Sequence, residues 1–351
     1  MSIAAVSLNL VAWMIDCMPC IEVHMLPYPH DLMRLAGLDP VQVFSALQAP
    51  GGVNPKTVRN MFEGKHTTRM STVRRYLESI VSKVVNVGGH TAEADKIQAL
   101  IGVASEQEGN PYFLAWETLF QGFEFGSQSQ AWLLMAEAKQ LVELTRSIQP
   151  YVEEQDPQGL ASVLTESDIP KTDVTRNAIR QLQEANKLSG SLLTSILAQL
   201  TLTNILHLIA CADSENELLT RLCPLFQEDG VKLPMARWLD GIRSDKSLAS
   251  DDALGMVLFP HWDPKNAGRE VKRWRAGELP AWKTVEKFPG NENNDQLYKV
   301  FFIIRVLHAV YSNLEEDGGA EIGIEPRLLF ETAPQLQEWA QQRAAILHSS
   351  I

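Results

Sequence analysis

The residues best suited to chemistry in this sequence are Lys and Arg side chains gathered into two short stretches, 54–76 and 263–288. The first stretch holds six bases and one acid, and the second holds seven bases and four acids. The whole chain has a formal net charge of −12, so the residues outside the two stretches carry −20. This concentration favours two basic faces on an acidic body, and binding to a polyanion such as DNA requires a positive face.

The first stretch predicts a short helix with an exposed basic side. Asn54 is a good N-cap and Pro55 a good first helical residue, and Gly64 ends the helix. Ser71 precedes a further helix, whose apolar residues recur at helical spacing as far as Val84. The amino end of a helix can meet phosphate, and Arg, Lys and Asn can hydrogen-bond to base edges in the major groove. The residue types therefore suit contact with duplex DNA.

The second stretch has the same plan. Asp263 and Pro264 begin a helix that continues to Ala276, and Gly277 ends it. A further helix containing Val285 comes next. Both stretches therefore predict a capped basic helix, a glycine and a second helix.

Three fragments of the first stretch carry a resemblance to a known family. They are VNPKTV at 53–58, MFEGK at 61–65 and STV at 71–73. Through them, residues 31–84 resemble the DNA-binding domain of phage-repressor-type (Cro and lambda-repressor-like) helix-turn-helix proteins. The APGG turn at 49–52 is longer than the turn of that family, whereas the second stretch supplies a family-like aromatic-x-x-Gly-x-x-Pro ending.

The resemblance implies a DNA-binding or regulatory protein of prokaryotic or phage type, which contacts duplex DNA through the two basic helices and acts as a homodimer. The candidate contact residues are Asn54, Lys56, Thr57, Arg59, Asn60 and Lys65 in the first stretch and Lys265, Arg269, Lys272, Arg273 and Arg275 in the second. The alternative is an all-helical protein–protein interaction scaffold that keeps the helix-turn-helix shape without DNA contact. The negative net charge favours this alternative.

The sequence gives no support to an enzyme. It contains no P-loop, no GxGxxG after a strand, no HExxH and no GxSxG. Cys17 and Cys20 form a CxxC, but without a second CxxC or a His pair they are weak evidence for zinc. We expect no catalytic residue, no cofactor and no metal site. Four cysteines are too few for a disulfide scaffold of this size, which favours a reducing cytoplasm.

Helical periodicity along almost the whole chain predicts an all-α protein, a multi-helix bundle with a helix-turn-helix-like unit at each of the two basic stretches. The predicted segments are an apolar leader or packed N-terminal helix at 1–24, a helix-turn-helix-like unit at 25–90, a helical domain at 91–150, a linker at 151–172, a helical core at 173–250, a second helix-turn-helix-like unit at 251–290 and C-terminal helices at 291–351. The apolar run at 2–15 is too short to span a bilayer, so no membrane role is expected. Met25 is an alternative first residue.

The helical core is expected to contain one very apolar region. Leucine and isoleucine make a broad apolar surface between Asp173 and Ala212, which is typical of a central buried helix or of a self-association surface. Residues 213–227 predict another helix. The segments 296–314 and 334–347 predict a very apolar helix and an amphipathic helix, respectively.

Overall fold

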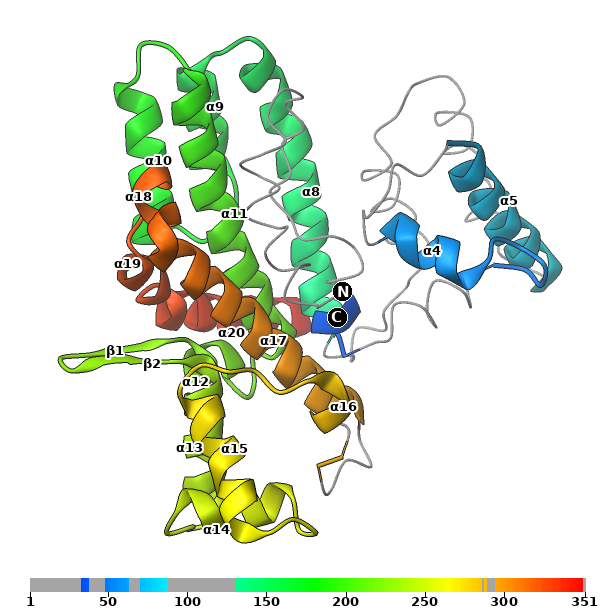
Figure 1. The fold of residues 1–351 in the computed structure, drawn as a ribbon. Coiled ribbons are helices and arrows are strands. Elements are labelled where there is room, and N and C mark those ends of the chain that lie inside the picture. The colour runs from blue at the N-terminus through cyan, green and yellow to red at the C-terminus, as the bar shows by residue number, and fades with distance from the viewer. Residues whose placement is uncertain are drawn as a thin grey trace. The chain divides into compact units, whose positions relative to one another are not determined.

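The computed structural model describes residues 33–37, 48–62, 70–87, 131–285, 287–288 and 294–349. These residues are mostly helical, which confirms the predicted all-α class (Figure 1). They divide into two compact units, an N-terminal unit within residues 33–142 and a C-terminal unit from Glu143 onward. Helix α8 (Ala131–Glu153) contains the boundary.

The N-terminal unit contains helices α4 (Pro55–Phe62) and α5 (Met70–Val87). Both helices lie where the first basic stretch predicts them. One side of each is buried: Val58 in α4 and Tyr76 and Leu77 in α5 have no exposed surface. The small core of this unit therefore fixes which side of α4 remains in water.

The turn before α4 is held by side-chain hydrogen bonds. The Gln48 amide donates to the carbonyl of Val53 at 2.6 Å and accepts from its N–H at 2.7 Å. Gly51 has a φ of +82°, which glycine tolerates best. A Cβ on Gly52 would lie 2.3 Å from Oε1 of Gln48 and 2.6 Å from Oγ of Ser79. Gly51 thus allows the backbone conformation of the APGG turn, and Gly52 allows the turn to approach α5 closely.

The C-terminal unit begins with helices that cover the segment expected to be a linker. Residues 151–172 hold helix α9 (Pro157–Glu166), which packs on helix α10 (Asp173–Glu184). The Asp156 side chain caps α9 by accepting from the N–H groups of Gln158 and Gly159, each at 3.0 Å. The proline that suggested a break is therefore the first residue of a helix, a position that suits proline.

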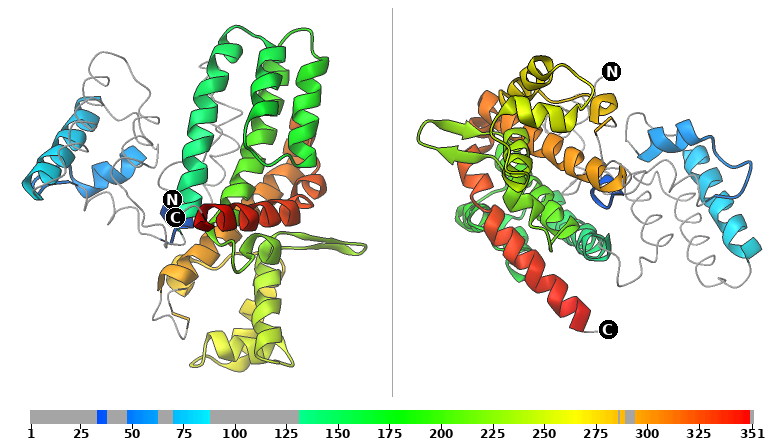
Figure 2. Two further views of the ribbon diagram at one scale, coloured as in Figure 1. Left: turned by 180° about the vertical axis from the view of Figure 1, so that it is seen from behind. Right: turned by 90° about the horizontal axis from the view of Figure 1, so that it is seen from below.

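Helix α11 (Gly190–Ala212) is the central helix of the C-terminal unit. Nearly every residue from Leu193 to its end is buried, because α10, α20 (Ala333–Ser349) and shorter helices pack around it. Figure 2 shows α20 crossing this group of helices. The predicted helical region 173–212 is thus two helices, separated by a break after Glu184, and Ser189 caps the second. The buried central helix expected from its apolar surface is confirmed.

Two helices among the described residues are long and apolar enough to span a membrane by length and composition alone, Gly190–Ala212 and Gln296–Glu316. In the first, 83% of the most apolar window is buried inside the protein, and in the second the share is 50%. A buried core helix can have the same length and composition, and α11 is buried among the other helices of its unit.

A two-stranded hairpin replaces part of a predicted helix. Helix α12 covers only Leu218–Leu222, and strands β1 (Leu225–Gln227) and β2 (Gly230–Lys232) come after it in antiparallel pairing. The prediction of a helix over residues 213–227 is therefore wrong beyond Leu222. The Asp-Gly pair at 229–230 is a hairpin signal, and it outweighed the helical spacing of the apolar residues before it.

The second basic stretch lies in a group of short helices. These are α13 (Pro234–Asp245), α14 (Asp251–Leu258), α15 (Pro264–Arg275) and α16 (Trp282–Val285). Aromatic rings join them to helix α17 (Asn294–Asn313), with Trp238 and Phe288 at ring-centroid distances of 4.9 and 5.9 Å from Phe301. The chain then passes through the π-helix η1 (Leu314–Gly318), α18 (Gly319–Ile322) and α19 (Pro326–Phe330).

Candidate nucleic-acid interface

The amino end of α4 is built from an Asx cap and a proline. Oδ1 of Asn54 accepts from the N–H of Lys56 at 2.9 Å, and the Asn54 carbonyl accepts from Thr57 and Val58. Pro55 occupies the first helical position, where its missing donor costs nothing. The sequence predicted this helix start, and the structure confirms it.

The side chains at this helix start differ in exposure. Asn54 and Lys56 are exposed, Thr57 is half-buried and Val58 is buried. Lys56 has no carboxylate within ion-pair distance among the described residues. Arg59 and Asn60 belong to α4, but their side chains lie outside the described part of the structure, and so does all of Lys65. Within the described residues, α4 therefore presents one uncompensated cation beside its amino end.

In the C-terminal unit, α15 crosses α14 at very short range. A Cβ on Gly255 would lie 2.5 Å from the carbonyl carbon of Ala267, and a Cβ on Gly268 would lie 1.8 Å from Oδ1 of Asp252. Two glycines facing each other's helix let the backbones approach this closely. This packing places α15 beside the carboxylates that α14 carries.

The amino end of α15 repeats the start of α4. Oδ1 of Asp263 accepts from the N–H groups of Lys265 and Asn266 at 3.1 and 3.2 Å, and Pro264 is the first helical residue. Lys265 and Arg269 are exposed, and neither has a carboxylate within ion-pair distance among the described residues. These two predicted contact residues are therefore available to a ligand.

The next two bases along α15 are paired with acids. Arg273 forms ion pairs with Glu270 at 2.8 Å and with Glu278 at 2.5 Å. The hydrogen bond from Arg273 to Glu278, reinforced by the one to Glu270, raises the pKa of Arg273. Lys272 lies 4.0 Å from Oδ1 of Asp252. All these groups keep substantial exposure, so water screens their charges, but each cation already has an anion beside it.

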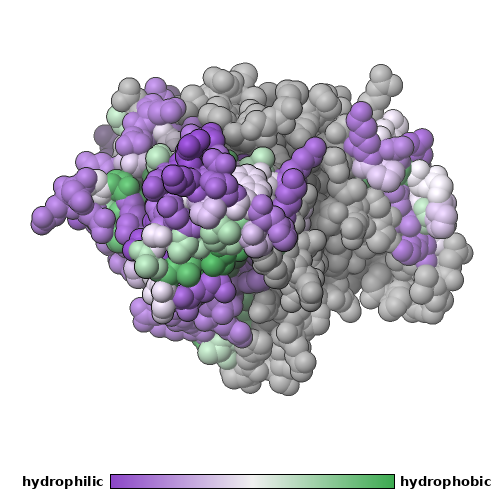
Figure 3. All heavy atoms as spheres, turned by 60° about the horizontal axis from the view of Figure 1, so that its bottom comes forward, coloured by the Kyte–Doolittle hydropathy of each residue, from purple (hydrophilic) through white to green (hydrophobic). Residues whose placement is uncertain are grey.

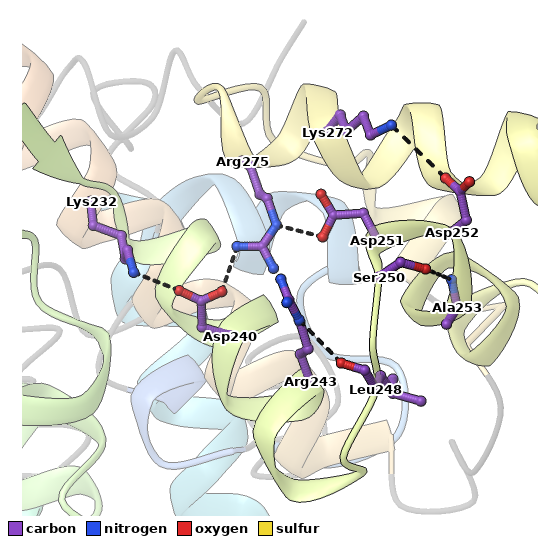
Figure 4. A network of polar contacts seen from close by, with 10 residues as sticks. All are labelled: Lys232, Asp240, Arg243, Leu248, Ser250, Asp251, Asp252, Ala253, Lys272 and Arg275. Carbon is purple, nitrogen blue, oxygen red and sulfur yellow. Dashed lines mark hydrogen bonds and ion pairs between the residues drawn. The ribbon is translucent and has the colours of Figure 1, made fainter.

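Arg275 is a structural clamp between three helices. Figure 4 shows its guanidinium between Asp240 of α13 and Asp251 of α14, at 2.6 and 2.9 Å. Its side chain is only 20% exposed. Lys232 of the hairpin adds a second cation, 2.9 Å from Asp240. The arginine that the sequence offered as a DNA contact is therefore engaged in ion pairs within the protein.

Two opposing effects set the pKa of Asp240 in this network. Burial by itself would raise that pKa, but hydrogen bonds from Lys232 and Arg275 and their positive charges outweigh it. The pKa of Asp240 consequently lies below its ordinary value. The carboxylate is therefore held in its charged form, as a clamp between two cations requires.

The sequence did not reveal the acidic partners of α15. Asp240 and Asp251 lie 35 and 24 positions from Arg275 along the chain, and no local pattern connects them. The sequence also did not reveal a buried base, Lys299 of α17. Its ammonium group donates to the carbonyl of Ala212 at 2.5 Å and lies 3.9 Å from Asp213. Burial lowers the pKa of Lys299, and Asp213 opposes that effect. A lone lysine in a very apolar predicted helix was the signal that could have identified it.

The described residues define an all-α protein in two compact units, with one short hairpin in the second unit. No protein-family model, no curated protein and no solved structure matches the chain.

Proposed function

We propose that this protein is a DNA-binding regulator that contacts duplex DNA through α4 of its N-terminal unit. The observation that carries the proposal is the start of α4, where Asn54 and Lys56 are exposed while Val58 is buried. A short capped helix with an exposed amino end is the kind of element that enters a major groove. The resemblance of residues 31–84 to phage-repressor-type domains supports the same assignment.

We do not propose that α15 contacts DNA in the way that α4 does. Three of its five candidate bases, Lys272, Arg273 and Arg275, lie beside carboxylates. Each of these bases already has an anion beside it, so part of its positive charge is neutralised before a phosphate arrives. Lys56 in α4 has no such competitor among the described residues.

A duplex titration at low salt tests the proposal. We expect mixed-sequence duplex DNA to bind, and Lys56→Ala combined with Arg59→Ala to weaken binding about tenfold or more. The matched control is Lys272→Ala combined with Arg273→Ala, which removes two bases from α15 and should leave binding unchanged. Free DNA at micromolar protein, or equal loss in both double variants, contradicts the assignment to α4.

The homodimer implied by the resemblance is part of the same proposal. A helix-turn-helix dimer binds two half-sites about one turn of DNA apart, so its affinity depends on half-site spacing. Sedimentation equilibrium measures the mass of the free protein. A strict monomer, free and on DNA, would remove this part of the proposal.

The second candidate function is a protein–protein interaction scaffold. The compensated bases of α15 favour it, and so does the formal net charge of −12. Figure 3 shows one face of the molecule on which hydrophobic residues form a band bordered by hydrophilic ones, and such bands mark interaction sites. This candidate predicts that duplex DNA stays unbound at low salt and that the α4 variants retain every binding property of the natural protein.

A further inference from the structure

An exposed tryptophan stands at the turn before α15. Trp262 is 44% exposed, although it belongs to a chain region rich in buried rings. Its ring stacks on Phe259 with centroids 4.3 Å apart and an interplanar angle of 17°, and Phe259 is buried. The stacking holds the indole in place before any ligand arrives. A rigid, half-exposed tryptophan loses little entropy on binding, which is why such residues serve as anchors in interfaces.

Three bases lie along one side of α15, which begins two residues after this tryptophan. Lys265, Arg269 and Lys272 are spaced four and three residues apart, which places them on one face of the helix. All three are exposed. Lys265 and Arg269 have no carboxylate within ion-pair distance among the described residues, and Lys272 has one at the limit of 4.0 Å. The row covers roughly 10 Å along the helix axis.

The surroundings of this row favour a peptide over a nucleic acid. Asp252, Asp263 and Glu270 flank the bases, so the positive surface is a narrow stripe between carboxylates. A nucleic acid presents phosphates continuously and would meet these acids as well. A partner helix with carboxylates spaced four and three residues apart can instead place each carboxylate opposite one base. An apolar residue one turn away on the partner helix can cover the indole.

We propose that Trp262, Lys265, Arg269 and Lys272 form a docking surface for an acidic amphipathic helix of a partner protein. The indole supplies the apolar contact, and the three bases pair with carboxylates on the partner helix. This surface is independent of α4 and of DNA binding, so the two proposals can fail separately.

A synthetic peptide tests the docking surface on the full-length protein. The probe is a fluorescently labelled helix of about 18 residues, with three Glu at the matching spacing and a Leu one turn away. Its control replaces the three Glu by Gln. We expect the Glu peptide to bind with an affinity that falls as salt rises, and the Gln peptide to bind at least about tenfold more weakly.

Two variants of the protein complete the test. Trp262→Ala, and separately Lys265→Glu with Arg269→Glu, should each weaken peptide binding about tenfold or more. The matched control is Lys187→Glu with Lys246→Glu, which makes the same charge change at two exposed lysines elsewhere in the unit and should bind normally. All substituted residues are exposed, so circular dichroism and the unfolding midpoint should stay unchanged for the charge variants.

Four outcomes would overturn the proposal. The Glu peptide does not bind at all, or it binds the Trp262 and Lys265/Arg269 variants as well as the natural protein. Alternatively, single-stranded or duplex DNA binds and is lost in these variants while the peptide is not bound, which would make the surface a nucleic-acid site. Finally, the variants abolish self-association measured without peptide, which would make a second copy of the chain the occupant.

Discussion

Helices α4 and α15 begin alike and end in different environments. Each starts with an Asx side chain that caps the backbone, a proline in the first position and a lysine in the second. Around α15, however, α13 and α14 bring Asp240, Asp251 and Asp252 beside its bases. Around α4, Lys56 meets no described carboxylate. Two similar sequences therefore offer different charges to a ligand, because charge on a surface depends on which groups the rest of the fold places nearby.

The two helices also differ in their own length and in the length of the next helix along the chain. Helix α4 has 8 residues and α15 has 12. The next described helix has 18 residues in the N-terminal unit and 4 in the C-terminal unit. The two basic stretches thus share the same kind of helix cap but differ in the lengths of their helices.

The largest effect is expected from filling the crossing of α14 and α15. Gly255→Val should destabilise the C-terminal unit by about 3 kcal/mol or more, because the new side chain meets the backbone of Ala267. Urea unfolding followed by circular dichroism measures this change. Duplex binding by α4 should survive under native conditions; if it is lost together with the fold, the two units are not independent.

A smaller effect is expected from removing the clamp. Arg275→Met should cost about 2 kcal/mol, since it leaves Asp251 without its cation and Asp240 with Lys232 alone in a partly exposed site. Lys56→Met is the comparison in α4 and should leave the free energy of unfolding unchanged. An Arg275→Met protein as stable as the natural one would show that the ion pairs contribute nothing.

The clamp also predicts a pH dependence. The pKa of Asp240 is lowered on folding, so its contribution to stability is present above the unfolded pKa of about 4 and is lost as the pH falls toward the folded pKa. Unfolding free energies measured from about pH 5 down to about pH 2 should fall less steeply for Arg275→Met than for the natural protein. Parallel curves would contradict the role of Arg275 in holding Asp240 charged.

The caps should be equivalent in the two units. Asn54→Ala and Asp263→Ala each remove a side-chain acceptor from a helix start, and each should cost about 1 kcal/mol in its own unit. Replacement by Ser should restore most of the loss. A clear difference between the two costs would show that the caps are not alike in energy.

The smallest effect is expected at Arg273. Its ion pairs with Glu270 and Glu278 are exposed, so Arg273→Ala should leave the unfolding midpoint unchanged within error. Thermal unfolding by differential scanning calorimetry checks this expectation. A clear loss of stability would mean that α15 depends on these pairs.

The sequence predicted local structure where the signal was local. The starts of α4 and α15 follow from Asn54-Pro55 and Asp263-Pro264, and the buried α11 follows from apolar residues on all sides. The linker at 151–172 was misjudged because Pro157 can either stop or start a helix, and the Asp156 cap decided for a start. The hairpin at 225–232 was missed although the Asp-Gly pair at 229–230 was visible in the sequence.

The sequence by itself determined the all-α class, the helix caps and the concentration of bases in two stretches, because caps and periodicity act between residues close in the chain. Only the tertiary structure decided which of those bases remain available. Asp240 reaches Arg275 across 35 positions, and Gly255 and Gly268 bring α14 against α15 so that Asp252 lies near Lys272. Such pairings depend on how helices pack, and packing is a property of the whole fold rather than of any segment.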